Sequence, residues 1–208
     1  MTVDDVLLVP VGHDLGVLYP EPGSDQRRQQ IRAGADVVEL EDMDFAIWLL
    51  AHGMGDQDRP TRASLNASAQ RLGLPAATID DAVDRFLVSG LLVEVQPSGE
   101  SAVLFAEQHQ LVPLMLGLGP DQEQPWLQTI GLLNQPVVQV SSPMYDVWAW
   151  AHLAPQLWTG CHDAAEVARL AGATDPEELD PRRVLAGLLG SVHALLCVRA
   201  AYFDRRRV

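Results

Sequence analysis

The chain has 208 residues, is 48% hydrophobic, and carries 28 acidic against 14 basic residues, for a formal net charge of −14. This balance opposes binding to nucleic acid, because that affinity depends largely on basic side chains that neutralise phosphates. No apolar run reaches the ~18 residues of a membrane span, and Met1 to Asp5 has no basic signal-peptide segment. We therefore expect a soluble, cytoplasmic protein with no membrane partner.

The two cysteines, Cys161 and Cys197, lie in the second half without the CxxC spacing of a zinc or redox motif. We expect buried free thiols rather than a disulfide framework. His162 adjoins Cys161, but no third ligand lies nearby in the sequence, which disfavours a metal or catalytic site. The sequence predicts neither a metal nor a cofactor.

Two stretches of the chain resemble each other. VVELEDMDFAIWLLAHG begins at Val37 and VVQVSSPMYDVWAWAHL begins at Val137, and they align without a gap. The identical pairs are Val37/Val137, Val38/Val138, Trp48/Trp148, Ala51/Ala151 and His52/His152. Chance gives about one identity over such a span, so the pattern indicates an internal duplication. It predicts two domains, at 1–106 and 107–203, and an Arg-rich tail at 204–208.

The first half is predicted to begin with strands and to continue with helices. The strands are expected at Val6–Pro10, Gly16–Tyr19 and Val37–Leu40, the first two forming a hairpin, with a polar loop over 20–35. The helices are expected at Met43–His52, Ser64–Leu72 and Thr78–Ser89. A closing β-hairpin is expected from Leu91–Val95 and Ala102–Ala106.

The second half is predicted to repeat this order. Its strands are expected at Leu111–Leu116, Leu127–Leu133, Pro136–Val140 and Ala194–Ala201, and its helices at Ser142–Leu153, Asp163–Gly172 and Asp180–Leu189. Three helices with a helix-turn-helix and a terminal hairpin are typical of a winged helix. The predicted fold class is α+β: two tandem winged helix-turn-helix domains, each preceded by a short three-stranded β element.

Aromatic residues distinguish the two halves. The second half carries four of the five tryptophans, and we expect these to cover a surface between the halves or between two chains: Trp126, Trp148, Trp150 and Trp158. A homodimer is therefore one arrangement open to this chain.

No constellation of residues predicts catalysis. His52 and His152 each end a hydrophobic helix, where a histidine commonly caps free carbonyls, and one histidine per repeat does not form a metal site. The acids Glu39, Glu41, Asp42 and Asp44 are interpreted as a solvated edge and a helix start. Gly117-Leu118-Gly119 lacks the third glycine of a dinucleotide-binding loop. We expect no enzyme.

A winged helix can bind DNA through its third helix, so the charge of that helix tests this function. In the first half it carries Asp80, Asp81 and Asp84 against Arg85. These acids would repel phosphates. Arg182 and Arg183 offer more positive charge in the second half, but DNA binding remains disfavoured.

The order of three strands leading into a winged helix resembles the precursor-peptide recognition element. This fold occurs in the peptide chaperone of pyrroloquinoline quinone biosynthesis and in enzymes that modify ribosomal peptides. The residues that carry the resemblance are Val37-Val38-Glu39-Leu40 leading into Asp44-Phe45, Ala69-Gln70-Arg71-Leu72-Gly73, and Phe86-Leu87-Val88-Ser89-Gly90-Leu91-Leu92.

The resemblance implies a peptide-binding function. In that family the leader peptide adds as a strand beside the third strand and lies against the third helix, a mode that uses an open sheet edge and an adjacent apolar face. The implied grooves would be lined by Val38, Leu40, Ile79, Val83 and Phe86 in the first half, and by Val138, Val140, Val184 and Leu188 in the second. The same side chains would otherwise form the core.

The function that the resemblance implies is a peptide-binding module that presents a precursor peptide to a modifying enzyme. Two alternative functions stay open. One is an assembly subunit that resembles the acidic tandem winged-helix partner of the bacterial kleisin and holds a helix. The other is an acidic transcription regulator.

Overall fold

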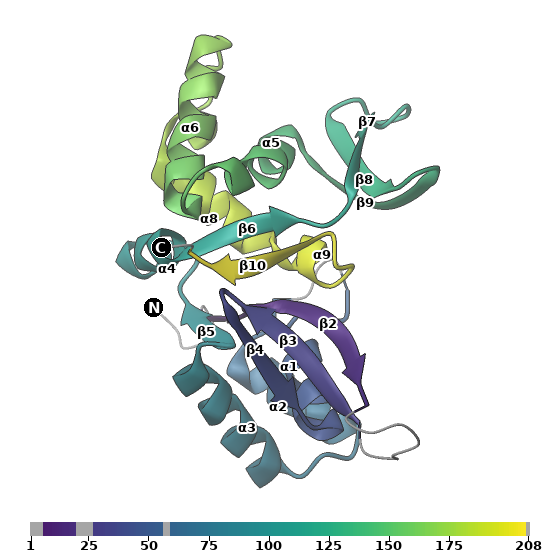
Figure 1. Ribbon diagram of the computed structural model, residues 1–208. Coiled ribbons are helices and arrows are strands. Elements are labelled where there is room, and N and C mark those ends of the chain that lie inside the picture. The colour runs from purple at the N-terminus through teal and green to yellow at the C-terminus, as the bar shows by residue number, and fades with distance from the viewer. Residues whose placement is uncertain (1–5, 20–26, 56–58, 207–208) are drawn as a thin grey trace.

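A computed structural model describes residues 6–19, 27–55 and 59–206, and combines helices with four small antiparallel sheets (Figure 1). The polar segment around Gly23 and Ser24 and the last two residues lie outside the described ranges. Among the described residues, no helix has both the length and the apolar character that crossing a membrane requires.

The first half begins with β1 and a three-stranded sheet, and its three helices lead to a closing strand. The elements are β1 (Leu7–Pro10), β2 (His13–Leu18), β3 (Arg28–Ala33), β4 (Asp36–Leu40), α1 (Asp42–Leu50), α2 (Arg62–Arg71), α3 (Ala76–Ser89) and β5 (Leu92–Val95).

Helix α4 (Glu100–Gln108) leads into the second half, which repeats the order with two extra short helices. The elements are β6 (His109–Pro113), β7 (Leu116–Pro120), β8 (Leu127–Leu132), β9 (Gln135–Ser141), α5 (Ser142–Trp150), the 3-10 turn η2 (Ala151–Leu153), α6 (Leu157–Leu170), α7 (Pro176–Leu179), α8 (Pro181–Ser191), α9 (His193–Leu196) and β10 (Ala201–Arg205).

The two halves have the same sheet topology. In each, the first strand pairs antiparallel with the last, as β1 with β5 and β6 with β10, while the three strands between form a separate sheet. The β2–β3 and β7–β8 pairings each contain a register shift that ends at a glycine with positive φ, Gly16 at 93° and Gly119 at 90°. A shared bulge at matching places is what a duplicated chain predicts.

The matched tryptophans make the same hydrogen bond. The indole Nε1 of Trp48 donates to the carbonyl oxygen of Leu91 over 3.1 Å, and that of Trp148 donates to Ala200 over 3.0 Å. Each acceptor directly precedes the closing strand, β5 or β10. Both indoles are almost fully buried, so this bond satisfies an N–H donor that has no access to water.

The predicted closing hairpin of the first half is wrong. Ala102–Ala106 lies inside α4, and β5 pairs with β1 instead of with a following strand. The buried residues Ala102, Val103, Phe105 and Ala106 lie on one face of a helix at spacings of one, three and four, and this face packs into the core. The structure therefore confirms an α+β chain without the hairpin expected of a winged helix.

Several strand assignments also change. β1 and β2 do not form a hairpin, and the expected loop at 20–35 contains β3. The second half has a strand, β7, that was not among the expected strands, and its closing strand is Ala201–Arg205 rather than Ala194–Ala201. Asp163 lies within α6 instead of capping it, because the helix begins at Leu157.

Each half has its own buried cluster, and β1 contributes side chains to both. Side chains alternate along β1, so Leu8 packs into the core of the first half while Leu7 and Val9 pack into that of the second. The expected boundary at 106/107 falls within α4, whose buried side chains belong to the second core.

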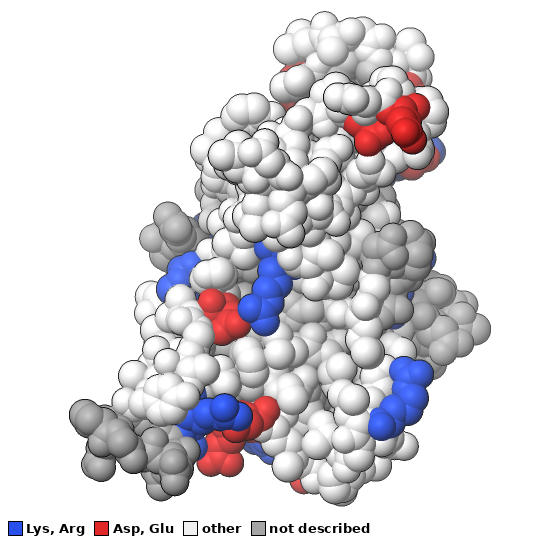
Figure 2. Space-filling view, turned by 90° about the vertical axis from the view of Figure 1, so that its right-hand side faces the viewer, with Lys and Arg blue, Asp and Glu red and all other residues white. Residues whose placement is uncertain are grey.

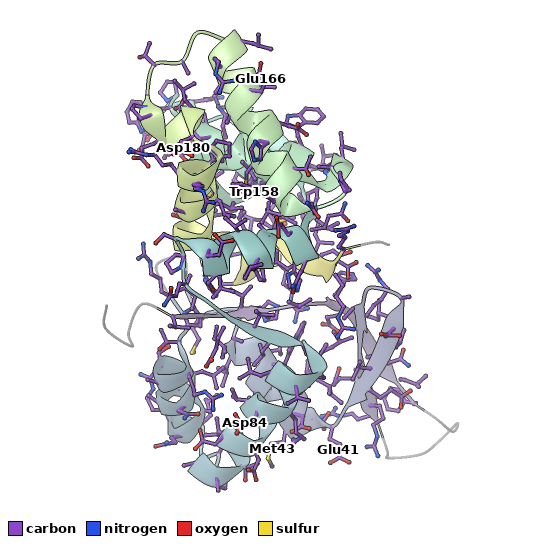
Figure 3. The ribbon with its side chains drawn as sticks, turned by 90° about the vertical axis from the view of Figure 1, so that its left-hand side faces the viewer. Glu41, Met43, Asp84, Trp158, Glu166 and Asp180 are labelled. Carbon is purple, nitrogen blue, oxygen red and sulfur yellow. The ribbon has the colours of Figure 1, made fainter. Side chains whose placement is uncertain are left out.

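The expectation that the tryptophans of the second half cover a surface between the halves is wrong for two of them. Trp126 is 66% exposed and Trp150 is 65% exposed. Trp148 is buried in the core, and Trp158 lies on α6 against the ring of His162 and beneath the guanidinium of Arg182 (Figure 3). A contact of Trp126 or Trp150 with a second chain stays a prediction.

Candidate functional site

The residues expected to line the first groove lie mostly in the core. Leu40 is 6% exposed, Phe86 is 2% exposed, and Ile79 and Val83 are fully buried. Val38 is half-buried and packs against the same cluster. These side chains join the β2–β3–β4 sheet to α1 and α3, so they support the fold before they can contact a partner.

The residues expected to line the second groove divide between core and surface. Val140 and Leu188 are buried, and Val138 and Val184 are half-buried. Val184 and Leu188 also border a cavity of ≈ 270 Å³, hereafter the α8 cavity. The remaining residues around this cavity come from the end of β9 and from α5, α7 and α8: Ser141, Pro143, Met144, Val147, Asp175, Glu177, Glu178, Arg183, Gly187 and Ser191.

Each three-stranded sheet leaves its last strand at an edge. β4 follows β3, and β9 follows β8, and neither has a strand partner on its outer side within the described parts of the chain. An edge strand presents unpaired backbone N–H and C=O groups that can bind an added strand. The structure thus brings the β9 edge close to the α8 cavity, since Ser141 belongs to both.

The corresponding region of the first half is bridged by the end of the chain. The guanidinium of Arg205 lies 3.3 Å from the carboxylate of Asp36, at the start of β4, and donates to the carbonyl oxygen of Ser89, at the end of α3. Arg205 therefore spans β4 and α3 at one end. No such bridge is found between β9 and α8 among the described residues.

Charges around the α8 cavity are mainly acidic. Asp175, Glu177 and Glu178 border it together with one base, Arg183. Arg183 is already paired, at 2.6 Å from Glu177 and 3.9 Å from Asp180. The mouth of the cavity therefore keeps a negative excess that favours a cationic group of a partner.

The sheet next to this cavity is almost free of charge. The sequence from 109 to 143 contains only two charged residues, Asp121 and Glu123. Large apolar side chains are exposed along it, among them Leu116, Trp126, Leu132 and Leu133. Figure 2 shows this part of the molecule as a broad surface with few charged side chains. Contiguous exposed apolar surface marks sites of interaction.

His52, one of the two repeated histidines, is enclosed in the core of the first half. It is buried just after α1, and its Nδ1 lies 3.2 Å from the carbonyl oxygen of Trp48 in that helix. Burial lowers its pKa to about 4, so it is neutral at physiological pH. The described residues hold no group of three or more His, Cys, Asp or Glu side chains arranged for a metal ion.

The thiol of Cys161 is unsuited to catalysis. It is fully buried, and desolvation raises its pKa to about 12. Because the thiolate is the nucleophile, this thiol is unreactive at neutral pH.

The acidic cluster after β4 pairs with arginines. Asp42 contacts Arg27 at 2.8 Å, and the hydrogen bond from that arginine lowers the pKa of the carboxyl group. Asp44 contacts Arg85 at 2.8 Å. In Figure 3, Glu41 lies at the exposed end of the first half, near Met43 and Asp84. These are surface ion pairs, as the sequence predicted for a solvated edge.

A larger groove was not found from the sequence. A cavity of ≈ 880 Å³, hereafter the α6 groove, lies along α6 and is walled by α5, η2 and the beginning of α8. The signal present in the sequence was the exposed pair Trp150 and Leu153 at the end of a helix, but their exposure depends on how α5 packs on α6.

No protein-family model, curated protein or solved structure matches this chain. The arguments for function therefore depend on the geometry of the chain itself.

Proposed function

We propose that the chain is a non-enzymatic peptide-binding or protein-binding module, which takes an extended segment of its partner along the edge of β9. The observation that carries the proposal is the position of the open β9 edge beside the α8 cavity. The backbone of β9 would supply hydrogen bonds, and the cavity would accept an apolar side chain of the added segment.

The charge of the site favours one class of partner. A segment with an apolar anchor and an adjacent Arg or Lys would place its cation near Glu178 and Asp175. The uncharged β7–β8–β9 surface offers further apolar contact. On the resemblance to the precursor-peptide recognition element, the partner would be the leader of a ribosomal precursor peptide, presented to a modifying enzyme.

The first half would then serve mainly as support. Its groove residues are buried, and Arg205 bridges β4 to α3. Its third helix exposes Asp80, Asp81 and Asp84 on the outer side, which argues against nucleic acid as the partner.

Gly187 provides a sharp test. It borders the α8 cavity, and a Cβ built there meets no atom within 4 Å. Gly187→Trp should therefore fill the cavity while leaving the core intact, and Gly187→Ala is the matched control. Peptides selected from a random library on the wild-type chain should retain binding to Gly187→Ala and lose it at least tenfold on Gly187→Trp. Equal binding to all three chains would contradict the proposed site.

A further inference from the structure

The α6 groove has an elongated floor made of one helix face. The residues that α6 and its C-cap contribute are spaced by three and four along the helix, namely Gly160, Asp163, Ala164, Val167, Ala168 and Ala171. This stripe covers about three turns, or roughly 16 Å of helix. Four of the six are Gly or Ala, so the backbone of an occupant can approach closely.

The walls of the groove are large and apolar. Trp150 is 65% exposed, Leu153 is 71% exposed and Val167 is 63% exposed. All three border the groove, and Val184 borders it from the side of α8. Exposed apolar side chains around a small-residue floor are typical of an interaction site, and tryptophan is among the residues that most often anchor a protein interface.

The charges that border the groove all have one sign. They are Asp146, Asp163 and Glu178, with no arginine among the residues around it. Asp146 makes no hydrogen bond or ion pair with any described residue, and desolvation raises the pKa of its carboxyl group. Asp146 is exposed at the border of the groove, so its carboxylate is available to pair with a cation that an occupant supplies.

The same position in the first half has a different character. A cavity of ≈ 850 Å³ lies there between α1 and α2, and its Leu50, Gly53 and Ser68 correspond to Trp150, Leu153 and Val167. The first two pairs follow from the match of α1 with α5. The third follows from aligning the glycines that come after α2 and α6, Gly73 and Gly172, which have φ of 85° and 84°. The first cavity is bordered by Arg59 and Arg71 and the second by acids. The duplicated position has therefore diverged toward an apolar, acidic groove.

We propose that the α6 groove binds an amphipathic helix of a partner protein, with its apolar stripe on α6 and an Arg or Lys facing Asp146. The walls are helices and offer no strand edge, so the occupant pairs by side chains, as in other helix-in-groove complexes. A second copy of this chain is disfavoured as the occupant, because each copy carries a net charge of −14.

This binding site goes beyond the strand site and adjoins it. Pro143, Glu178 and Val184 border both the α6 groove and the α8 cavity. A single partner that has a helix followed or preceded by an extended segment would reach both sites. The two sites remain separable, because Gly187 borders only the α8 cavity and Ala168 only the α6 groove.

The test uses three synthetic peptides, each roughly 18 residues or five turns long. One is an amphipathic helix with a leucine stripe flanked by arginines. The second replaces every arginine with glutamate, and the third scrambles the first so that the leucines no longer form a stripe. Calorimetric titration of the full chain should detect binding of the basic helix and at least tenfold weaker binding of the other two. Equal binding of the scrambled peptide, or no binding of the basic helix, would overturn the proposal.

Matched variants locate the binding. Ala168→Arg places a long cation on the floor of the groove, and Leu170→Arg places the same side chain on the same helix but outside the residues around the groove. Ala168→Arg should weaken binding of the basic helix at least tenfold, and Leu170→Arg should leave it unchanged. Asp146→Asn keeps the shape of the side chain and removes its charge, so it should weaken binding of the basic helix several-fold. This variant provides a test even if Ala168→Arg does not fold.

Gly187→Trp separates this inference from the proposed strand site. It fills the α8 cavity and should leave binding of the helix unchanged. If Gly187→Trp abolishes binding of the helix, or if Ala168→Arg folds and binds as the wild type does, the helix does not occupy the α6 groove and the inference fails. Loss of the strand site alone would not affect this result.

Discussion

Arg32 of β3 donates a hydrogen bond to the carboxylate of Asp204 in β10 over 3.1 Å, and so joins the two duplicated halves. The side chain of Asp204 is 2% exposed. Its other oxygen accepts a hydrogen bond from the backbone N–H of Gly34 at 2.6 Å, and Arg32 also donates to the hydroxyl of Tyr202 at 2.6 Å. The contact is therefore a buried, multiply bonded carboxylate and not a surface ion pair.

Replacement of this carboxylate should destabilise the whole chain. Asp204→Ala removes the carboxylate that neutralises Arg32 and the acceptor of the Gly34 N–H, and we expect a loss of about 3 kcal/mol in the free energy of unfolding. Urea denaturation measures it. Glu166→Ala, which removes the exposed pair with Arg169, is the control and should change stability by less than about 0.5 kcal/mol. Similar effects of the two variants would show that the contact does not hold the halves together.

The two matched tryptophans should respond alike. Trp48→Phe and Trp148→Phe each remove a buried indole, its hydrogen bond to the carbonyl oxygen of Leu91 or Ala200, and part of the volume that fills the core. We expect each to cost about 2 to 4 kcal/mol in thermal or urea unfolding. Trp126→Phe, at a 66% exposed position, should have little effect. A near-zero cost at Trp48 or Trp148 would argue against their equivalent structural function.

Acid should weaken the fold through His52. Its pKa is about 4 in the folded chain, against an ordinary value of 6.5, because burial disfavours the charged ring. The unfolded chain takes up this proton below pH 6.5, and the folded chain takes it up only near pH 4. The contribution of His52 to the free energy of unfolding is therefore fully present above pH 6.5 and decreases as the pH falls from 6.5 to 4. The loss amounts to about 3 kcal/mol at most.

His52→Asn tests this titration, because the amide nitrogen can replace the donor that faces the carbonyl of Trp48. The free energy of unfolding, measured from pH 7 to pH 4, should fall less steeply in the variant than in the wild type. Burial also lowers the pKa of His109 and contributes to the remaining slope. An unchanged slope would mean that His52 is accessible to protons in the folded chain.

Gly187→Ala should stabilise the chain. Gly187 lies within α8, and a Cβ there meets no neighbouring atom within 4 Å. Alanine loses less backbone entropy than glycine on forming a helix, which predicts a gain of about 0.5 to 1 kcal/mol. Chemical denaturation measures the gain, and a loss of stability would show that the space beside Gly187 is not open.

The sequence predicted the repeated elements best where one face of the chain is buried in both halves. α1 and α5 were found because Trp48 and Trp148 recur with their neighbours, and α3 because its apolar face is regular. β3 was missed since most of its side chains are polar (RQQIRA), and only Ile31 and Ala33 are buried. Val103 and Phe105 suggested a strand, because a short apolar run does not distinguish a strand from a helix.

The candidate sites were less accessible to sequence reasoning. Ile79, Val83 and Phe86 have the spacing of an apolar helix face, and that pattern is the same whether the face meets a peptide or a core. The α6 groove depends on the packing of α5 against α6, so no local pattern contains it. Two of the residues predicted to line the second groove, Val184 and Leu188, nevertheless border a cavity.

The most direct measurement for the central claim is an NMR titration of the ¹⁵N-labelled chain with a peptide selected on the wild type. We expect the amides of Gln135–Ser141 in β9 to shift most, together with those of α8 around Gly187, and we expect the shifts to persist in Gly187→Ala and to vanish in Gly187→Trp. Shifts confined to other helices, with the amides of β9 unchanged, would contradict strand addition at this edge.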